Sequence, residues 1–269
     1  MRATVFEDKR AKMPGYAQPK DNGIRCLWGG RVAWTREGNR HCNHIQDIVW
    51  HKLRGLVPEG WTVDGELILN RHVYSFQKCQ SAVKKDNHLS SSLEYVVFDG
   101  YNKAEPGLIF SERLKVLKRL IATPTVIIPD LQRLDFWYKK WLSDGYEGLI
   151  YRADVPYIFG SGGRNLMKKK PVKHAEFIII GVWEGTGKNV GTPVYRLART
   201  DVHYVPGEPA SVKNSFGCVP EGDYQEKREL WKEAQMFNLT GTPYTVKFWD
   251  YYESGVPQFP IGIGVRDYE

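Results

Sequence analysis

Short apolar stretches separated by glycine-containing turns fill the first part of the chain. Gly23–Trp28 and Arg31–Thr35 flank two glycines, which predicts a β-hairpin. The polar first 15 residues are expected to be loosely held. Asn70-Arg71 lies between two of the further strand-like runs and predicts a second hairpin. These further runs are Val63–Leu69, His72–Phe76, Leu93–Phe98, Gly148–Arg152 and Leu166–Lys169.

Helical spacing of apolar residues interrupts these strands. We expect helices to begin at Asn43 or His44, at Ser111 and at Asp130, where a polar residue precedes the periodic stretch. The third helix is expected to end before Gly145. The apolar positions of these helices are Ile45, Ile48, Val49, Leu53 and Leu56, then Leu114, Leu117, Leu120 and Ile121, and finally Leu134, Tyr138, Trp141 and Leu142.

The last third of the chain has a different pattern, which is that of a small β-barrel. One helix, roughly Asp223–Met236, interrupts about five short strands in about 90 residues. Lys170–Lys173 reads as a connector. We therefore expect an α+β protein with domains at 1–172 and 173–269. The clearest strand-like runs of the second domain are Glu176–Trp183, Val194–Thr200, Tyr244–Tyr252 and Ile261–Val265.

The charge is unevenly divided. The 269 residues carry a net charge of +7. Residues 1–175 contain 29 Lys+Arg and 18 Asp+Glu, a net of +11, whereas the remainder contains 9 and 13, a net of −4. The first part is therefore the one suited to a polyanion such as nucleic acid.

Composition also excludes several classes of protein. No apolar run of about 18 residues is present, so no membrane association is expected. The first residues lack the apolar core of a signal peptide. The four cysteines form no C-x-x-C pair, which favours reduced thiols in the cytoplasm.

Five short motifs carry candidate chemistry, and each has an ordinary structural interpretation when taken alone. Lys20 opens Lys20–Arg25, a turn with Asn22-Gly23; Asp64–Glu66 starts a strand; Phe98-Asp99 ends one; Glu147 lies between two glycines; and Leu166–Lys170 places Lys168 and Lys170 on one strand face. A lysine can act as a nucleophile if its charge is suppressed. An exposed turn lysine, an exposed strand glutamate and a core phenylalanine are the alternatives.

The order of these motifs resembles that of the covalent nucleotidyltransferases, the superfamily of ATP- and NAD-dependent DNA ligases, RNA ligases and mRNA-capping enzymes. The match runs from Gln18 to Lys170. The ending Pro257–Tyr268 looks like the OB domain of small phage ATP-dependent DNA ligases. This resemblance implies an ATP-grasp-like nucleotidyltransferase (adenylation) domain followed by a C-terminal OB-fold β-barrel.

The resemblance implies that the protein seals 3′-hydroxyl/5′-phosphate nicks in duplex DNA through a lysyl-AMP and an adenylated 5′-phosphate. ATP and Mg²⁺ or Mn²⁺ are the expected cofactors, and nicked duplex DNA is the expected partner. A monomer is expected, in the host cytoplasm if the chain is phage-encoded. The processes served by such an enzyme are DNA repair, replication and recombination.

The resemblance also assigns roles to individual residues. Lys20 matches the nucleophile, and Lys168 and Lys170 match the pair that holds the α-phosphate. Glu147 matches the carboxylate that positions the divalent ion, and Glu66 matches one near the ribose that could also face the metal. The remaining assignments are Phe98 on the adenine face, Gln18 at the base edge, Arg25 as the motif arginine, and Arg36, or else Arg31 or Arg40, at the nick 5′-phosphate.

Two departures from the family pattern stand out. Asn22 occupies the place of an aspartate, and Arg266-Asp267 matches the C-terminal box only approximately. The positive charge of Arg25, Lys168, Lys170 and a bound divalent ion is expected to lower the pKa of Lys20.

Three other functions compete with a DNA ligase. A capping guanylyltransferase would share most motifs and use GTP. An RNA ligase would more often have Ser or Thr where Ile24-Arg25 stands. A non-catalytic nucleic-acid-binding module would keep the fold but would not need Lys20, Glu147 and the lysine pair.

Overall fold

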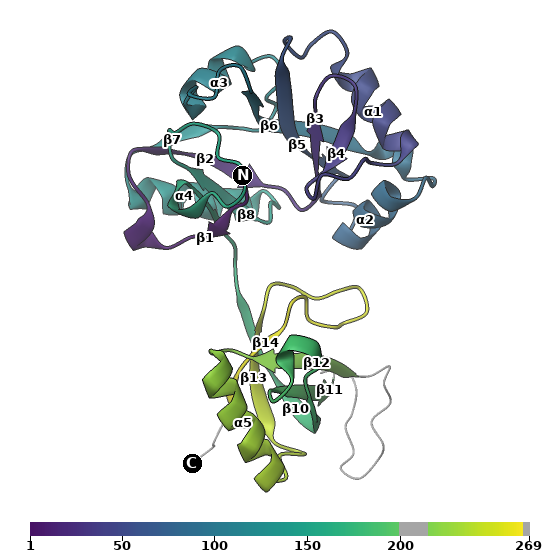
Figure 1. Ribbon diagram of the computed structural model, residues 1–269, viewed down its shortest axis with the longest axis vertical. Helices are drawn as coiled ribbons and strands as arrows, with labels where there is room; N and C mark the ends of the chain where they lie inside the picture. The colour runs from purple at the N-terminus through teal and green to yellow at the C-terminus, as the bar shows by residue number, and fades with distance from the viewer. Residues whose placement is uncertain (199–214, 266–269) are drawn as a thin grey trace. The chain divides into compact units, whose positions relative to one another are not determined.

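The computed structural model describes residues 1–198 and 215–265 (Figure 1). The chain divides into two compact units, Met1–Lys170 and Pro171–Glu269. The expected class, mixed helices and sheets with a C-terminal barrel, is confirmed. Among the helices of the described ranges, none has the length and apolar character needed to cross a bilayer.

A five-stranded sheet forms one half of the first unit. Its order is β1 (Thr4–Val5), β9 (Leu166–Lys169), β8 (Gly148–Arg152), β2 (Gly15–Lys20) and β7 (Val126–Ile128). Helix α4 (Leu131–Ser143) packs on one face, where Trp141 joins a core with Ala17, Leu149 and Met167. Because side chains alternate along a strand, the opposite face carries Gln18, Lys20, Arg152 and Lys168.

A four-stranded antiparallel sheet forms the other half. Its order is β4 (Ala33–Thr35), β3 (Ile24–Trp28), β5 (Trp61–Ile68) and β6 (Glu94–Asn102). Helices α1 (Asn43–Leu53) and α2 (Phe76–Lys84) supply the side chains that cover one face of it. The other face carries Arg25, Asp64, Glu66 and Phe98.

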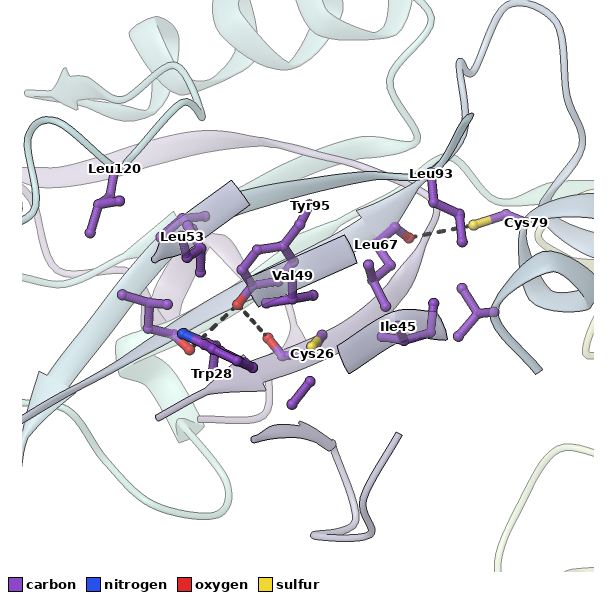
Figure 2. Packing of buried hydrophobic residues seen from close by; sticks show 14 of the residues in the cluster. Cys26, Trp28, Ile45, Val49, Leu53, Leu67, Cys79, Leu93, Tyr95 and Leu120 are labelled. Carbon is purple, nitrogen blue, oxygen red and sulfur yellow. Dashed lines mark hydrogen bonds between the residues drawn. The ribbon is translucent and has the colours of Figure 1, made fainter. Parts of the chain in front are cut away.

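Figure 2 shows the core between this sheet and its helices. Ile45, Val49 and Leu53 come from α1, and Cys79 comes from α2. The Tyr95 hydroxyl lies within this apolar cluster and donates a hydrogen bond to the Cys26 carbonyl oxygen at 2.9 Å. The buried hydroxyl is therefore paired. The candidate site residues of this sheet lie on its other face.

Shorter helices complete the first unit. Helix α3 (Phe110–Val116) packs near β6. The Glu112 carboxylate accepts a hydrogen bond from the Ile109 N–H at 2.9 Å, so the cap of this helix is Ile109, two residues before the expected cap Ser111. Within residues 1–198 and 215–265 the 3₁₀ turns are Asp8–Arg10, Ser90–Ser92, Gly163–Asn165 and Gly187–Asn189.

The described residues of the second unit form a closed five-stranded barrel and one α-helix. The strand order is β10 (Lys173–Glu184), β11 (Pro193–Ala198), β12 (Ser215–Pro220), β14 (Ile261–Val265) and β13 (Pro243–Phe248). Aromatic rings fill its interior, with the Tyr195 and Tyr244 rings stacked at 4.5 Å between centroids. Helix α5 (Tyr224–Met236) begins where Asp223 accepts from the N–H groups of Gln225 and Glu226.

Two expectations about local structure are wrong. His72–Phe76 forms no strand; Asn70 starts a turn, in which its Oδ1 accepts from the His72 N–H at 3.0 Å, and Ser75 then caps α2. The first residues are not loosely held, because β1 pairs in parallel with β9 and Met1 is buried.

Other expected elements differ at their ends or cannot be compared. Tyr244–Tyr252 shortens to Pro243–Phe248, and β12 was not expected at all. The end of Val194–Thr200 and the Arg266-Asp267 box lie outside the described residues.

Candidate active site

Lys20 ends β2 on the face opposite α4, directly beside the start of β8. Its Nζ donates a hydrogen bond to the Glu147 carboxylate and another to the Asp21 carbonyl oxygen at 3.0 Å. The second oxygen of Glu147 forms an ion pair with Lys170. The backbone joins the same two segments, because the Glu147 N–H donates to the Lys20 carbonyl oxygen at 2.9 Å. Glu147 is therefore held between two ammonium groups.

Two glycines allow this arrangement by close backbone approach. A Cβ on Gly23 would lie 2.4 Å from the Leu67 carbonyl oxygen, and the Gly23 N–H donates to Glu66 Oε1 at 3.2 Å. The turn therefore needs glycine for space, and not for the positive φ that the sequence suggested. A Cβ on Gly148 would lie 2.2 Å from the Lys169 carbonyl oxygen, so β8 and β9 also meet without room for a side chain.

The charges around Lys20 act against the expected activation. Burial lowers the pKa of Lys20, but the carboxylates of Glu66 and Glu147 outweigh it, and the net shift is upward. Arg25 is not among the main charges that act on Lys20, and its guanidinium is directed at Asp64. In the protein without bound ligands the pKa of Lys20 is therefore raised, and its lowering by a bound divalent ion stays a prediction.

The other two lysines of the motif lie in the same cluster. Burial and then the Lys20 charge lower the pKa of Lys168, and Arg36 adds to this effect. Burial is also the main cause of a lowered pKa at Lys170, against which the Glu147 charge acts. The sequence thus correctly places these lysines together, on a site that an anion would relieve of like-charge repulsion.

Arg25 lies in a buried corner of the four-stranded sheet. Its Nε donates to Asp64 Oδ1 at 2.8 Å, its Nη2 donates to the other oxygen, and Nη1 donates to the Met1 carbonyl oxygen. The Tyr157 hydroxyl donates to Asp64 Oδ2 at 2.7 Å. The guanidinium carbon lies 6.0 Å from the centroid of the Phe98 ring, so Arg25 borders the site while its hydrogen bonds go to the scaffold.

Gln18 is 1% exposed, and its amide is occupied by protein partners. Its Nε2 donates to the Phe98 carbonyl oxygen at 3.0 Å and to Thr125 Oγ1 at 2.9 Å, while its Oε1 accepts from Arg152 Nε at 2.6 Å. Phe98 itself is half-buried, with the Arg152 guanidinium carbon 5.3 Å from its ring centroid. Gln18 therefore shapes the support of Phe98.

A buried charge network lies behind this support. Asp99 accepts from Arg113 Nε at 2.9 Å and from Arg152 Nη1 at 2.8 Å, and all three side chains are buried. Arg152 thus joins Asp99 to Gln18. This network fixes the position of β6, which carries Phe98, relative to β2, which carries Lys20, and to its neighbour β8.

The three candidate DNA-binding arginines are all exposed but differ in position. Arg36 follows β4, one residue after Thr35, which pairs with Cys26. It therefore lies at the Arg25 end of the hairpin, and its charge acts on Lys168. Arg31 lies in the turn at the opposite end, and Arg40 forms a backbone bridge with Trp34. Of the three, Arg36 has the position that suits a role beside the site.

Several residues of the site had been given no role from the sequence. They are Asp64, Asp99, Arg113, Arg152, Tyr157 and the Asp21–Arg71 ion pair. Asp64 and Asp99 stand in two of the motifs, and Asp64 alternates with Glu66 on one strand face. The remaining residues carry no local signal, since their partners lie far away in the sequence.

The fold and the ordered motifs define a member of the nucleotidyltransferase superfamily. The sequence model of the family described as ATP dependent DNA ligase domain matches residues 5–170, which is more than half of the chain. The chain therefore belongs to the ATP-dependent DNA ligase family, and it is an enzyme of that class. No curated protein matches the sequence.

Solved structures of DNA ligases have the same fold. A structure of a Lig E DNA ligase has a TM-score of 0.74 at 20% identity, covering 99% of this chain and 98% of that one. The Chlorella virus DNA ligase-adenylate has a TM-score of 0.54 at 23% identity, covering 100% of this chain and 98% of that one. At these identities the likeness concerns the fold alone.

Proposed function

We propose that this protein seals 3′-hydroxyl/5′-phosphate nicks in duplex DNA, with Lys20 carrying AMP as the covalent intermediate. The single observation that supports it most is the Lys20–Glu147–Lys170 cluster, in which a carboxylate contacts both the candidate nucleophile and a candidate phosphate-binding lysine. Membership of the ATP-dependent DNA ligase family supports the reaction and the nucleotide.

In the first step Lys20 must lose a proton, because an ammonium group has no electron pair to donate. The Lys20 Nζ–H donates to the Glu147 carboxylate, which is therefore placed to accept that proton. A bond then forms between Nζ and the α-phosphorus, and the bond to the leaving pyrophosphate breaks. Lys168 and Lys170 would offset the charge that builds on the phosphate oxygens.

The later steps transfer the nucleotide to DNA and release it. The adenylyl group passes from Lys20 to the nick 5′-phosphate, and the 3′-hydroxyl then displaces AMP. During all steps Phe98 would stack on the adenine, with Gln18 and Arg152 supporting it from the protein side.

A divalent cation would be held by Glu147, with Glu66 nearby. Among the described residues no group of three or more His, Cys, Asp or Glu side chains is arranged to hold a metal. Mg²⁺ commonly takes one or two protein carboxylates and completes its coordination with water and substrate phosphates, so this donor set fits. When bound, Mg²⁺ or Mn²⁺ would offset the charge of the phosphates. Each Glu147 oxygen contacts one lysine, and a cation would take the lone pairs that these contacts leave on the carboxylate.

Three further properties are part of the proposal. The sequence up to residue 175, with its net charge of +11 (29 Lys+Arg against 18 Asp+Glu), would provide most of the DNA affinity. The protein would act as a monomer. The four cysteines are free thiols, which supports a reducing, cytoplasmic compartment.

The adenylation test uses labelled ATP with Mg²⁺, mass spectrometry of the peptide that bears AMP, and a chase with nicked DNA. We expect one AMP on Lys20, no adduct in Lys20→Ala, and transfer to DNA on chasing. Lys247→Ala is the matched control, because Lys247 pairs with Glu221 on the barrel and should label normally. An adduct that survives Lys20→Ala would overturn the assignment, and labelling by GTP would favour a capping enzyme.

A second test addresses Arg36. Loss of a charge-assisted hydrogen bond to the 5′-phosphate costs roughly 1.5–3 kcal/mol, or about 10- to 100-fold in rate. Arg36→Ala should therefore slow sealing by pre-adenylated enzyme by about this factor and leave lysyl-AMP formation within about twofold. The exposed Arg119 provides the control variant Arg119→Ala. Equal losses in both steps would remove Arg36 from the DNA-binding role and point to Arg31 or Arg40.

A further inference from the structure

Arg71 occupies the segment between β5 and α2 and has no part in the family motifs considered above. The backbone around it is fixed, because Asn70 accepts from the N–H groups of Val73 and Tyr74 at 3.1 and 2.9 Å through its carbonyl oxygen. The Asn70 side chain also accepts from the His72 N–H. The Arg71 side chain therefore leaves a defined turn, and its direction is set by the scaffold.

The guanidinium joins two segments that flank the lysine site. Its Nε donates to Asp21 Oδ1 at 3.0 Å, and its Nη2 donates to the same oxygen. Its central carbon lies 3.9 Å from the centroid of the Tyr146 ring. Asp21 directly follows Lys20, and Tyr146 directly precedes Glu147.

This contact is more shielded from solvent than an ordinary surface ion pair. The side chains of Asp21 and Arg71 are only 10% and 26% exposed. The neighbouring His72 packs on Gly145, where an added Cβ would lie 2.6 Å from the imidazole ring. Two adjacent residues of the β5–α2 segment therefore contact two adjacent residues just before Glu147.

We propose that Arg71 is a positioning residue for the adenylation step: by joining Asp21 to Tyr146, it sets the placement of Lys20 relative to Glu147. This inference rests on the proposed function in one respect, which is the assignment of Lys20 as the nucleophile. Arg71 itself contacts neither Lys20 nor Glu147 among the interactions described for it, so it acts through their neighbours.

The chemistry of arginine suits this role. Its planar group can donate two hydrogen bonds to a carboxylate while stacking on an aromatic ring, and lysine cannot do both at once in the same geometry. Displacement of a reacting group by about 1 Å can cost about 100-fold in rate. A loss of Arg71 should therefore slow attack by Lys20 while leaving the lysines and the aromatic ring that would bind ATP in place.

The test is single-turnover formation of lysyl-AMP by the full chain at several ATP concentrations. We expect Arg71→Ala to lower the maximal rate by about 10- to 100-fold, with the half-saturating ATP concentration changed by less than about threefold. The same final amount of lysyl-AMP should form, only more slowly. Arg71→Lys, which keeps the charge and remains testable if Arg71→Ala folds poorly, should give an intermediate rate.

Two controls separate positioning from general damage. Arg54→Ala removes another arginine that stacks on an aromatic ring, Trp50, at 4.8 Å, and it should leave the adenylation rate unchanged. In the Asp21→Asn background, Arg71→Ala should have a much smaller effect than in the native chain, because its hydrogen-bond partner is already altered. The rates are compared at a temperature at which all variants are folded.

Three results would overturn the proposal: an unchanged rate in both Arg71 variants, a loss confined to the ATP concentration dependence, or the same fold-loss in the native and Asp21→Asn backgrounds. Failure of the proposed function would look different. In that case the native chain itself would form no adduct on Lys20.

Discussion

The two units bury different kinds of side chains. The first unit buries five charged side chains, namely Asp21, Asp64, Asp99, Arg113 and Arg152. The described part of the barrel buries Thr192 and Ser215 as its polar residues, and the rest of its core is aromatic or aliphatic with one cysteine. The charged interior thus coincides with the unit that carries the lysine site.

This difference shows what each unit depends on. Taking charges out of water is costly, and the cost is recovered only where every charge keeps its partners. Asp99 satisfies two arginines at once, and Arg152 in turn orients Gln18 behind Phe98. The barrel depends instead on buried apolar area and on close packing between its side chains, as in the ring stack of Tyr195 on Tyr244. Single polar substitutions should therefore affect the two units very differently.

The largest effect should follow from Asp99→Ala, which leaves Arg113 and Arg152 buried without their shared carboxylate. Removing one member of a buried ion pair costs about 3–5 kcal/mol, so the free energy of unfolding of the first unit should fall by about that amount. Urea unfolding monitored by tryptophan fluorescence measures it. A loss below about 1 kcal/mol would mean that water reaches the arginines and that the charge network is not buried.

Glu66 should have a smaller effect on the free energy of unfolding, and this effect should depend on pH. Burial raises its pKa from 4.5 to about 7, so the folded state binds the proton more tightly than the unfolded state does. Between these two values the folded protein holds more protons, and its stability must fall as the pH rises through this range. The fall should be at most about 3.5 kcal/mol, since one pKa unit corresponds to about 1.4 kcal/mol.

Glu66→Gln should remove this component, because an amide does not titrate. Urea unfolding of both proteins at several pH values, without ATP or divalent ions, gives the comparison. Parallel curves for the two proteins would show that Glu66 is well solvated in the folded state.

The smallest effect is expected from an ion pair on the barrel. Lys247 pairs with Glu221, whose side chain is 57% exposed. Exposed pairs contribute roughly 0–1 kcal/mol, so Glu221→Gln should change the stability of the barrel by no more than that. If this substitution costs as much as Asp99→Ala, the contrast between the two interiors fails.

Sequence patterns predicted the parts of the fold that rest on local periodicity. The helix capped by Asp130 and the strands around Glu66, Leu149 and Met167 were all expected, because alternation and spacing mark buried faces. The strand β1 is two residues long and exists only because β9 lies beside it. In the segment before α2, alternating residues suggested a strand, although Phe76, Cys79 and Val83 share a helical face.

The site was predictable to a similar extent. The motif residues come from short sequence matches, and the structure brings Lys20, Glu147, Lys168 and Lys170 together. The ion-pair and hydrogen-bond partners of these residues were not predictable, because they depend on contacts across sheets. Arg25 pairs with Asp64 and does not reduce the pKa of Lys20, and Arg71, expected in a hairpin turn, reaches Asp21.

The strand order of the five-stranded sheet bears on how the protein folds as it is synthesised. The strands β3 to β6 all lie between residues 24 and 102, so all four strands of their sheet are synthesised early. The strand that carries Lys20 must wait for β7 and β8, and β1 must wait for β9 at residue 166. Pairings this distant along the chain form slowly and leave strand edges open in the meantime. Because Glu147 immediately precedes β8, the lysine gains its neighbouring strand and its carboxylate from the same newly emerged segment. A nascent chain would thus expose Lys20 without its partner until that segment leaves the ribosome.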